Sequence, residues 1–325
     1  MRSKKGLQLF NSLLLLHGLP VIDSVEDLSK LIRVRIETLE RIIRYSDKFY
    51  VKYQLPKKTI GYRTIRVPSR QLKGIQSWIL RNILDHLCAH PASKGFDKGL
   101  SIKNNAQPHI GATHLVKLDM ENFFGTVTAS QIYTIFRSIG YSSNIASKLT
   151  SLCSCDGFLP QGSPASPKLA NLVCHRLDGR IQGYISKSGL NYTRYADDIT
   201  ISGFSSRKVY LASLVAKKVI ESEQFSVNTS KTFFVGPNRR KKVTGLIVGT
   251  SKVGIGRNEY RNMRLSLYRL LWGKQSDYKY IIGKLNWIKD VDQDSFRRLK
   301  SLIERLLENQ NNLEFTNELM RYKKT

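Results

Sequence analysis

Residues 192–202 read Tyr-Thr-Arg-Tyr-Ala-Asp-Asp-Ile-Thr-Ile-Ser, a pair of aspartates between two extended segments. Segments rich in β-branched and aromatic residues on both sides of a short polar break are typical of a β-hairpin. We therefore expect a tight turn that contains Asp197 and Asp198. Two consecutive aspartates are most often a solvated turn, but their carboxylates repel each other unless a cation lies between them. The turn is therefore a candidate cation site.

A third acid fits the same chemistry. The apolar run Leu115–Leu118 predicts a short strand that ends at Asp119. Two Mg²⁺ ions about 3.5–4 Å apart can stabilise the attacking and leaving oxygens of an in-line displacement. Hard cations of this kind prefer carboxylate oxygen. Asp119, Asp197 and Asp198 are therefore the candidate ligands of two Mg²⁺ ions in nucleotidyl transfer.

The rest of the chain alternates predicted helices and strands. Apolar spacing predicts two short helices within residues 24–46, with Ser24 and Asp27 as a capping box, and a hairpin over residues 49–67. Further helices are expected over residues 69–88, 129–140, 142–153, 165–187 and 207–221, and from residue 257 to the end. Short strands are expected near residue 233 and over 243–248 and 253–255. The order is not a strict βαβ alternation, so the predicted class is α+β.

The charge of the chain indicates its partner. Lys and Arg number 53 against 25 acids, which gives a formal net charge of +28. Phosphate polyanions are the usual partners of such a protein. A membrane partner is disfavoured, because we find no basic amphipathic helix and the apolar run Leu13–Leu16 is too short to span a bilayer. Residues 231–284 hold 13 basic residues and only two acids, which favours nucleic-acid binding there over an ordinary solvated helix face.

The four cysteines indicate a reducing compartment, but they do not indicate a functional site. Cys88, Cys153, Cys155 and Cys174 lack paired CxxC spacing, which argues against a zinc site or a disulfide framework. Reduced thiols in a cytoplasmic protein are the expectation.

Five blocks of the sequence resemble, in order and spacing, the motifs of reverse transcriptases. They are Arg63-Thr64-Ile65-Arg66-Val67-Pro68, Lys117-Leu118-Asp119-Met120-Glu121-Asn122-Phe123-Phe124, Leu159-Pro160-Gln161-Gly162-Ser163-Pro164 through Leu172, Tyr195-Ala196-Asp197-Asp198 and Asn228-Thr229-Ser230-Lys231-Thr232. Together they cover about residues 49–250. The resemblance implies an RNA-directed DNA polymerase.

Two further elements resemble signatures of bacterial retron reverse transcriptases. They are Asn105-Ala106-Gln107-Pro108-His109 and Val243-Thr244-Gly245. Such enzymes copy part of a structured noncoding RNA (msr-msd) into DNA (msDNA). They prime from the 2′-hydroxyl of an internal guanosine, and many act in phage defence with an effector protein. The resemblance implies these properties here, with the cognate RNA, its DNA product and deoxynucleotides as partners.

The resemblance also implies roles for single residues. Asp119, Asp197 and Asp198 would bind the metal ions, with the carbonyl of Met120 as an added ligand. Phe124 holds the position of the steric gate that excludes ribonucleotides, although a core aromatic is a fair alternative. The remaining expected nucleotide contacts are those of Gln161, Lys231 and Arg63, the last with Lys57 or Lys58.

RNA contacts are expected from both retron-like elements and from the basic stretch that follows them. The candidate residues are Asn105, His109, Val243, Thr244, Gly245, Arg257, Arg261 and Arg264. For Asn105 and His109, a capping or packing role in local structure is the alternative.

The expected architecture is a right-hand polymerase. It has a helical extension over residues 1–48, fingers and an antiparallel palm over 49–250, and a basic helical thumb over 251–325. Such a chain leaves no room for a ribonuclease H domain, so we expect a host ribonuclease H to degrade the template.

Two rival interpretations remain. One is another bacterial reverse transcriptase, of the intron-derived or diversity-generating type, against which the Val-Thr-Gly triplet and the short chain argue. The other is a noncatalytic RNA-binding protein on a polymerase scaffold. The intact set of three aspartates opposes it, because a retired site is free to lose its charge repulsion.

Overall fold

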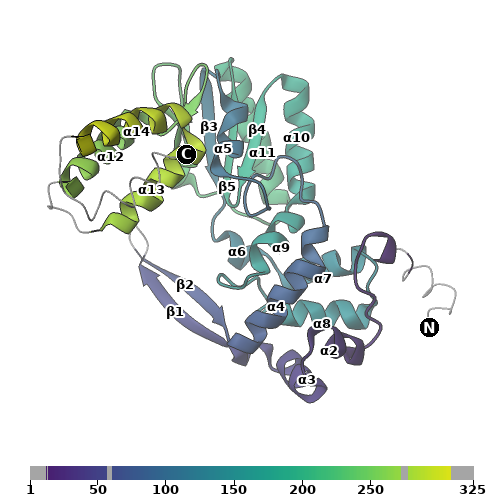
Figure 1. The fold of residues 1–325 in the computed structure, drawn as a ribbon. Helices are drawn as coiled ribbons and strands as arrows, with labels where there is room; N and C mark the ends of the chain where they lie inside the picture. The colour runs from purple at the N-terminus through teal and green to yellow at the C-terminus, as the bar shows by residue number, and fades with distance from the viewer. Residues whose placement is uncertain (1–11, 13, 57–60, 272–276, 309–325) are drawn as a thin grey trace.

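The computed structural model describes residues 12, 14–56, 61–271 and 277–308 (Figure 1). A four-stranded antiparallel sheet, here the central sheet, lies in the middle of the molecule in the order β4-β5-β3-β6. Its strands are β3 (His114–Asp119), β4 (Asn191–Tyr195), β5 (Asp198–Gly203) and β6 (Phe233–Val235). The predicted hairpin around Asp197 and the predicted strand that ends at Asp119 are therefore confirmed.

The two faces of the central sheet have different partners. Val116, Leu118, Ile199 and Ile201 are buried in the main hydrophobic core, against the helices α10 (His175–Ser188) and α11 (Ser206–Ser222). Because side chains alternate along a strand, Lys117 and the aspartates at the strand ends face the other way. Part of that second face is covered by α5 (Ile102–Ala106) and the 3₁₀ turn η3 (Gln107–His109).

Helices and a hairpin precede the central sheet. The N-terminal helices are α2 (Val25–Ile32) and α3 (Ile36–Arg44), and the predicted capping box is present, with Ser24 Oγ accepting from the Asp27 N–H at 3.1 Å. The predicted hairpin is also present, as β1 (Tyr50–Pro56) paired with β2 (Tyr62–Pro68). Its connection, with Lys57 and Lys58, lies outside the described residues.

Two predicted helices differ from those observed. The helix expected to reach Cys88 is α4 (Arg70–Asn82), followed by the 3₁₀ turn η2 (Leu84–His86). Helix α4 ends at Asn82, whose side-chain amide donates to the Trp78 carbonyl. Such local side-chain bonds to the backbone make asparagine unfavourable inside helices. The helix expected over residues 165–187 is divided at Cys174 into α9 (Ser166–Val173) and α10. The predicted helices α7 (Ala129–Ser138) and α8 (Ser143–Cys153) are confirmed, and the short α6 (Phe123–Thr126) precedes them.

A C-terminal subdomain, defined here as β7–β9 with α12–α14, packs around a second hydrophobic core, which also includes Ala106, Leu115 and Val235. Its elements are β7 (Lys241–Val243), β8 (Leu246–Val248), β9 (Val253–Gly254), α12 (Gly256–Leu271), α13 (Tyr278–Val291) and α14 (Gln293–Glu308). The strand predicted over residues 243–248 is instead a hairpin, because Thr244 and Gly245 both have positive φ, 43° and 92°, and reverse the chain. No described helix is long and apolar enough to cross a membrane.

One buried ion pair lies directly beneath the aspartate turn. Arg194 and Asp178 have fully buried side chains and form a two-point contact, with nitrogen–oxygen distances of 2.7 and 2.8 Å. Arg194 also donates to Asn171 Oδ1 at 3.1 Å and to the Ala196 carbonyl at 3.0 Å. Tyr192 donates its hydroxyl to Asp178 at 2.6 Å. The guanidinium thus joins α9, α10 and the turn between β4 and β5.

We predict that Arg194→Met lowers the free energy of unfolding by about 3–5 kcal/mol, because the carboxylate of Asp178 stays buried without its cation. Urea unfolding followed by circular dichroism measures the change. The double variant Arg194→Met/Asp178→Leu should recover part of the loss, because it removes both buried charges. Arg239→Met, at an exposed arginine, is the matched control. Equal unfolding midpoints for Arg194→Met and Arg239→Met would contradict the assignment.

Candidate active site

Strand register brings the three predicted aspartates to one end of the central sheet. Asp119 and Asp198 are direct partners across β3 and β5, so their side chains lie on the same face. The Asp197 carbonyl accepts from the Met120 N–H at 3.0 Å, which ties the β4–β5 turn to the residue after Asp119. Two segments about 80 residues apart thus meet at a single set of carboxylates.

The turn that carries Asp197 is held in a strained conformation. Ala196 has φ 57°, in the left-handed region that residues other than glycine rarely adopt. The guanidinium of Arg194 stabilises it through the Ala196 carbonyl. From the other side, a Cβ on Gly95 would lie 3.3 Å from the Ala196 nitrogen, so the chain there approaches closely. Arg194 was not predicted as a site residue, although a charged residue inside a strand directly before the turn was a usable signal.

Two lysines neutralise the outer carboxylates. Lys117 Nζ lies 3.1 Å from Asp198 Oδ2, and Lys231 Nζ lies 3.1 Å from Asp119 Oδ2. Burial, together with the charges of Asp119 and Asp198, raises the pKa of Asp197 above its usual range, although Lys231 opposes the shift. The site therefore concentrates negative charge in a partly buried place, and oxygen donors of this kind suit a hard divalent cation. Of the two lysines, Lys117 had no predicted role.

The predicted metal ligand Met120 can contribute only through its backbone. Its side chain is 1% exposed and belongs to the main core. Its N–H already donates to the Asp197 carbonyl. Its carbonyl is therefore the group that could reach an ion beside Asp119.

Aromatic rings connect the predicted steric gate to the hairpin. Phe124 lies on α6, and its ring centroid is 6.2 Å from that of Phe96. Phe96 in turn lies 6.1 Å from the Tyr195 ring. Phe96 has φ 67° and a side chain 44% exposed, unusual for a large aromatic residue. It was missed in the sequence, because only the folded chain places residue 96 beside residues 124 and 195.

The predicted nucleotide-pocket loop is fixed to the hairpin β1–β2. The Gln161 carbonyl accepts from the Arg66 N–H at 2.8 Å. Gly162 has φ 137°, and a Cβ there would lie 2.5 Å from the Arg66 carbonyl oxygen, so this position requires glycine. Arg63, three residues before Arg66 on β2, is exposed. Lys57 and Lys58, its predicted companions, lie outside the described residues.

The predicted RNA contacts divide into exposed and buried groups. Arg257, Arg261 and Arg264 are exposed on α12, and their spacing of four and three residues places them on one helix face. Gly245 is exposed and Thr244 is half-buried at the β7–β8 turn.

Three other predicted RNA contacts are not supported, because their side chains are buried. Asn105 is 1% exposed, and His109 and Val243 are 0% exposed. The hydrogen bonds of Asn105 and His109 go to other groups of the protein. These side chains offer no surface on which RNA could lie, which favours the alternative of local structure for Asn105 and His109.

A second acidic group in the described part of the chain does not suit a metal. Asp47, Cys155 and Asp156 place ligand atoms within 4.8 Å of one another, which the three aspartates of the central sheet do not. Asp156, however, is already paired with Lys52 at 3.0 Å and Arg66 at 3.3 Å. Burial, followed by the charge of Asp156, raises the pKa of the Cys155 thiol to about 11, so the thiol stays protonated at neutral pH. We interpret the group as an ion-pair cluster that attaches β1 and β2 to the rest of the chain.

Comparison with known proteins shows the family to which this chain belongs. The family model described as reverse transcriptase (RNA-dependent DNA polymerase) matches residues 55–262. The retron Ec86 reverse transcriptase of Escherichia coli is 46% identical over 291 residues, which cover 89% of this chain and 91% of that protein. The retron Mx65 reverse transcriptase of Myxococcus xanthus is 30% identical over 307 residues, with 87% and 72% covered. The chain therefore belongs to the retron reverse transcriptases, and it is an RNA-directed DNA polymerase with the α+β right-hand fold of fingers, palm and thumb.

Proposed function

We propose that this enzyme copies part of a structured noncoding RNA, the msr-msd RNA of its retron, into msDNA, starting from the 2′-hydroxyl of an internal guanosine. The observation that carries the proposal is the β3–β5 register, which brings Asp119 and Asp198 together beside Asp197. It occurs in a chain 46% identical to a retron relative. RNA template and DNA product are the partners of this family's reaction.

Asp119, Asp197 and Asp198 would hold two Mg²⁺ ions, with the Met120 carbonyl as a further ligand. When bound, the ions would lower the pKa of the primer hydroxyl and neutralise charge on the attacking and leaving oxygens. Burial and the two neighbouring carboxylates raise the pKa of Asp197, and a bound cation would remove the repulsive part of that penalty. The strained Ala196 turn and the Arg194 bond would keep the carboxylate of Asp197 in place.

Four side chains would handle the deoxynucleotide. Phe124 would close the space beside C2′, so that a ribose hydroxyl does not fit. Gln161, on the loop fixed to β2, would contact the incoming nucleotide. Lys231 would leave Asp119 to neutralise the pyrophosphate group, and Arg63 would hold the triphosphate from the hairpin with a two-point guanidinium contact.

The exposed arginines of α12 would bind the cognate RNA. Arg257, Arg261 and Arg264 share a helix face within the basic stretch of residues 231–284. A duplex stem presents phosphates and 2′-hydroxyls, so recognition would rest on shape and charge. Gly245 and the backbone of the β7–β8 turn would add contacts next to this face.

The proposals on partner proteins and cellular role rest on membership of the retron family. A host ribonuclease H would remove the copied template, and an effector protein would act with the enzyme and its msDNA against phage in the cytoplasm. We also propose that the chain divides into a helical extension (1–48), fingers and palm (49–250) and a thumb (251–325), of which residues 1–11, 13 and 309–325 lie outside the described residues.

We predict that Asp198→Asn or Asp197→Asn lowers DNA synthesis by roughly a thousandfold or more, because each removes a ligand that stabilises transition-state charge. RNA binding should stay near the wild-type level, because the basic face lies elsewhere. The measurement is incorporation of deoxynucleotides on an oligo(dT)-primed poly(rA) template with Mg²⁺. Binding of a fluorescent RNA stem-loop is measured in parallel.

The matched control is Glu37→Gln, which removes an exposed carboxylate on α3 and should keep full activity. Polymerisation at the wild-type rate by either aspartate variant would refute the metal assignment and return the noncatalytic alternative to consideration.

We predict that Phe124→Val reduces discrimination against ribonucleotides by about 10- to 100-fold, with a smaller loss for deoxynucleotides, because the smaller side chain admits the 2′-hydroxyl. The ratio of kcat/KM for dTTP and UTP on the same template measures this. Phe204→Val, at an exposed phenylalanine after β5, should leave the ratio unchanged. An unchanged ratio in Phe124→Val would place the gate elsewhere.

A further inference from the structure

The two segments that resemble retron signatures are hydrogen-bonded to each other. The side-chain amide of Asn105, on α5, donates to Thr244 Oγ1 at 3.3 Å, across 139 positions of sequence. Thr244 Oγ1 in turn donates to the Ile102 carbonyl at 3.3 Å. Short elements that are far apart in the chain therefore form one contact between α5 and the β7–β8 turn.

Thr244 occupies a conformation that its residue type disfavours. Val243 and Leu246 pair across a two-residue turn, and both Thr244 and Gly245 have positive φ. Asparagine, aspartate and glycine are the usual residues at the first position of such a turn. A β-branched residue in the left-handed region is a true outlier. The observed bonds of the hydroxyl give a reason for threonine at this place.

His109 continues the contact into the central sheet. Its Nδ1 lies 2.7 Å from Ser202 Oγ, and its Nε2 lies 2.8 Å from Thr193 Oγ1. Thr193 Oγ1 also donates to the Asn105 carbonyl at 3.3 Å. Both ring nitrogens of His109 are thus paired with hydroxyl groups of the central sheet. Burial lowers the pKa of His109 to about 3, so the ring stays neutral and keeps this arrangement at neutral pH.

These bonds reach the strands that carry the aspartate turn. Thr193 lies on β4, two residues before Tyr195, and Ser202 lies on β5, four residues after Asp198. Both hydroxyls are on the face that carries Asp198, because side chains two apart share a face. A continuous series of hydrogen bonds therefore joins the β4–β5 hairpin to the C-terminal subdomain through α5 and η3.

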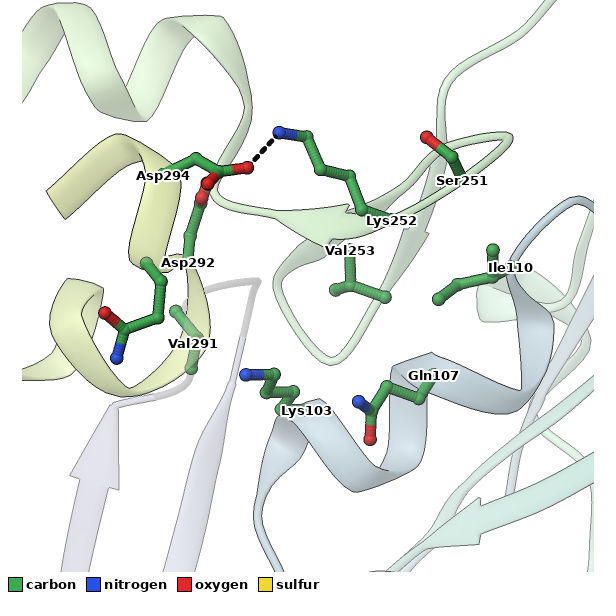
Figure 2. A pocket seen from close by; sticks show the side chains of 10 residues that line it. Lys103, Gln107, Ile110, Ser251, Lys252, Val253, Val291, Asp292 and Asp294 are labelled. Atoms are coloured by element: carbon green, nitrogen blue, oxygen red, sulfur yellow. Dashed lines mark hydrogen bonds and ion pairs between the residues drawn. The ribbon is translucent and has the colours of Figure 1, made fainter. Parts of the chain in front are cut away.

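Packing on the outer side of α5 is incomplete. Figure 2 shows a pocket between α5–η3, the β9 region and the corner between α13 and α14. The volume of this pocket is about 260 Å³. Lys103 and Gln107 line it from α5–η3, and Lys252 and Val253 from the C-terminal subdomain. Two hydrogen bonds cross between the two parts near this pocket: Lys103 Nζ donates to the Asp290 carbonyl at 3.3 Å, and the Gly111 N–H donates to the Gly249 carbonyl at 3.0 Å. Ala106 and Leu115 also pack in the core of the C-terminal subdomain. The half-buried side-chain bonds at Thr244 are therefore one of several contacts that place the two parts.

We propose that Asn105, His109 and Thr244 are positioning residues, which set the C-terminal subdomain against the catalytic hairpin and act on primer–template handling without contacting RNA through their side chains. The inference rests on the proposed catalytic role of the β4–β5 turn. Under the proposed function the primer–template duplex lies between that turn and the C-terminal subdomain, so a looser junction is expected to release it more often.

Three substitutions at Thr244 test the proposal. Thr244→Val keeps the shape and removes the hydroxyl, Thr244→Ser keeps the hydroxyl, and Thr244→Gly removes it while relieving the left-handed strain. Thr134→Val, at an exposed threonine on α7, is the matched control. Oligo(dT) on poly(rA) with a heparin trap measures the length synthesised per binding event, KM for primer–template, and kcat. Anisotropy of a fluorescent RNA stem-loop measures RNA affinity, and circular dichroism measures folding.

We expect Thr244→Val and Thr244→Gly to shorten the product per binding event and raise KM for primer–template by about three- to tenfold, the effect of one or two lost hydrogen bonds. The value of kcat should change by less than about twofold, and Thr244→Ser should restore wild-type behaviour. Because Thr244→Gly relieves strain, it should remain folded even if Thr244→Val does not.

Wild-type product length in Thr244→Gly would overturn the proposal. So would lost affinity for the stem-loop with unchanged primer extension, because that pattern belongs to a direct RNA contact. A wild-type protein that makes no DNA on this template would instead overturn the proposed function, and this inference with it.

Discussion

The pairing of Asp119 with Asp198 is the constraint on which the rest of this site depends. Like charges directly opposite each other across two strands are destabilising, and the buried carboxylate of Asp197 adds to the repulsion. The surrounding structure compensates at several points. Lys117 and Lys231 approach the two outer carboxylates, and Arg194 holds the strained turn from below. We propose that cation-dependent nucleotidyl transfer uses this concentrated charge.

The two faces of the central sheet have different roles: one packs in the hydrophobic core, and the other carries the aspartates. Its apolar face, with Leu118 and Ile199, joins the main core beneath α10 and α11. Its polar face carries the carboxylates at one end and is covered by α5 and η3 at the other. The cover satisfies the hydroxyls of Thr193 and Ser202 through His109. The same segment touches the C-terminal subdomain, whose core includes Ala106 and Leu115. The polar face thus links the end of the sheet that carries the aspartates to the C-terminal subdomain, which we propose binds nucleic acid.

The sequence was sufficient to predict those helices and strands that local residue patterns determine. Alternating apolar residues located the hairpin around Asp197 and the strand before Asp119, and capping residues located α2. It did not allow prediction of features that depend on distant partners. The Arg194–Asp178 pair and the position of Phe96 require the folded sheet. The expected strand over 243–248 failed because Thr244 is a β-branched residue, which favours strands, and its left-handed turn is stabilised by Asn105 and Ile102, far away in the chain. For the same reason Asn105 and His109 were predicted as RNA contacts although both are buried.

We propose that this enzyme extends its own cognate RNA from an internal guanosine. The most direct measurement is to coexpress the wild-type protein with its neighbouring noncoding locus, and to sequence the copurified nucleic acid before and after treatment with a 2′–5′ debranching enzyme. We expect DNA joined to a single internal guanosine, which debranching releases and which is absent when Asp198→Asn replaces the wild-type protein. Only linear DNA, or no DNA from a protein that extends an annealed primer normally, would contradict it.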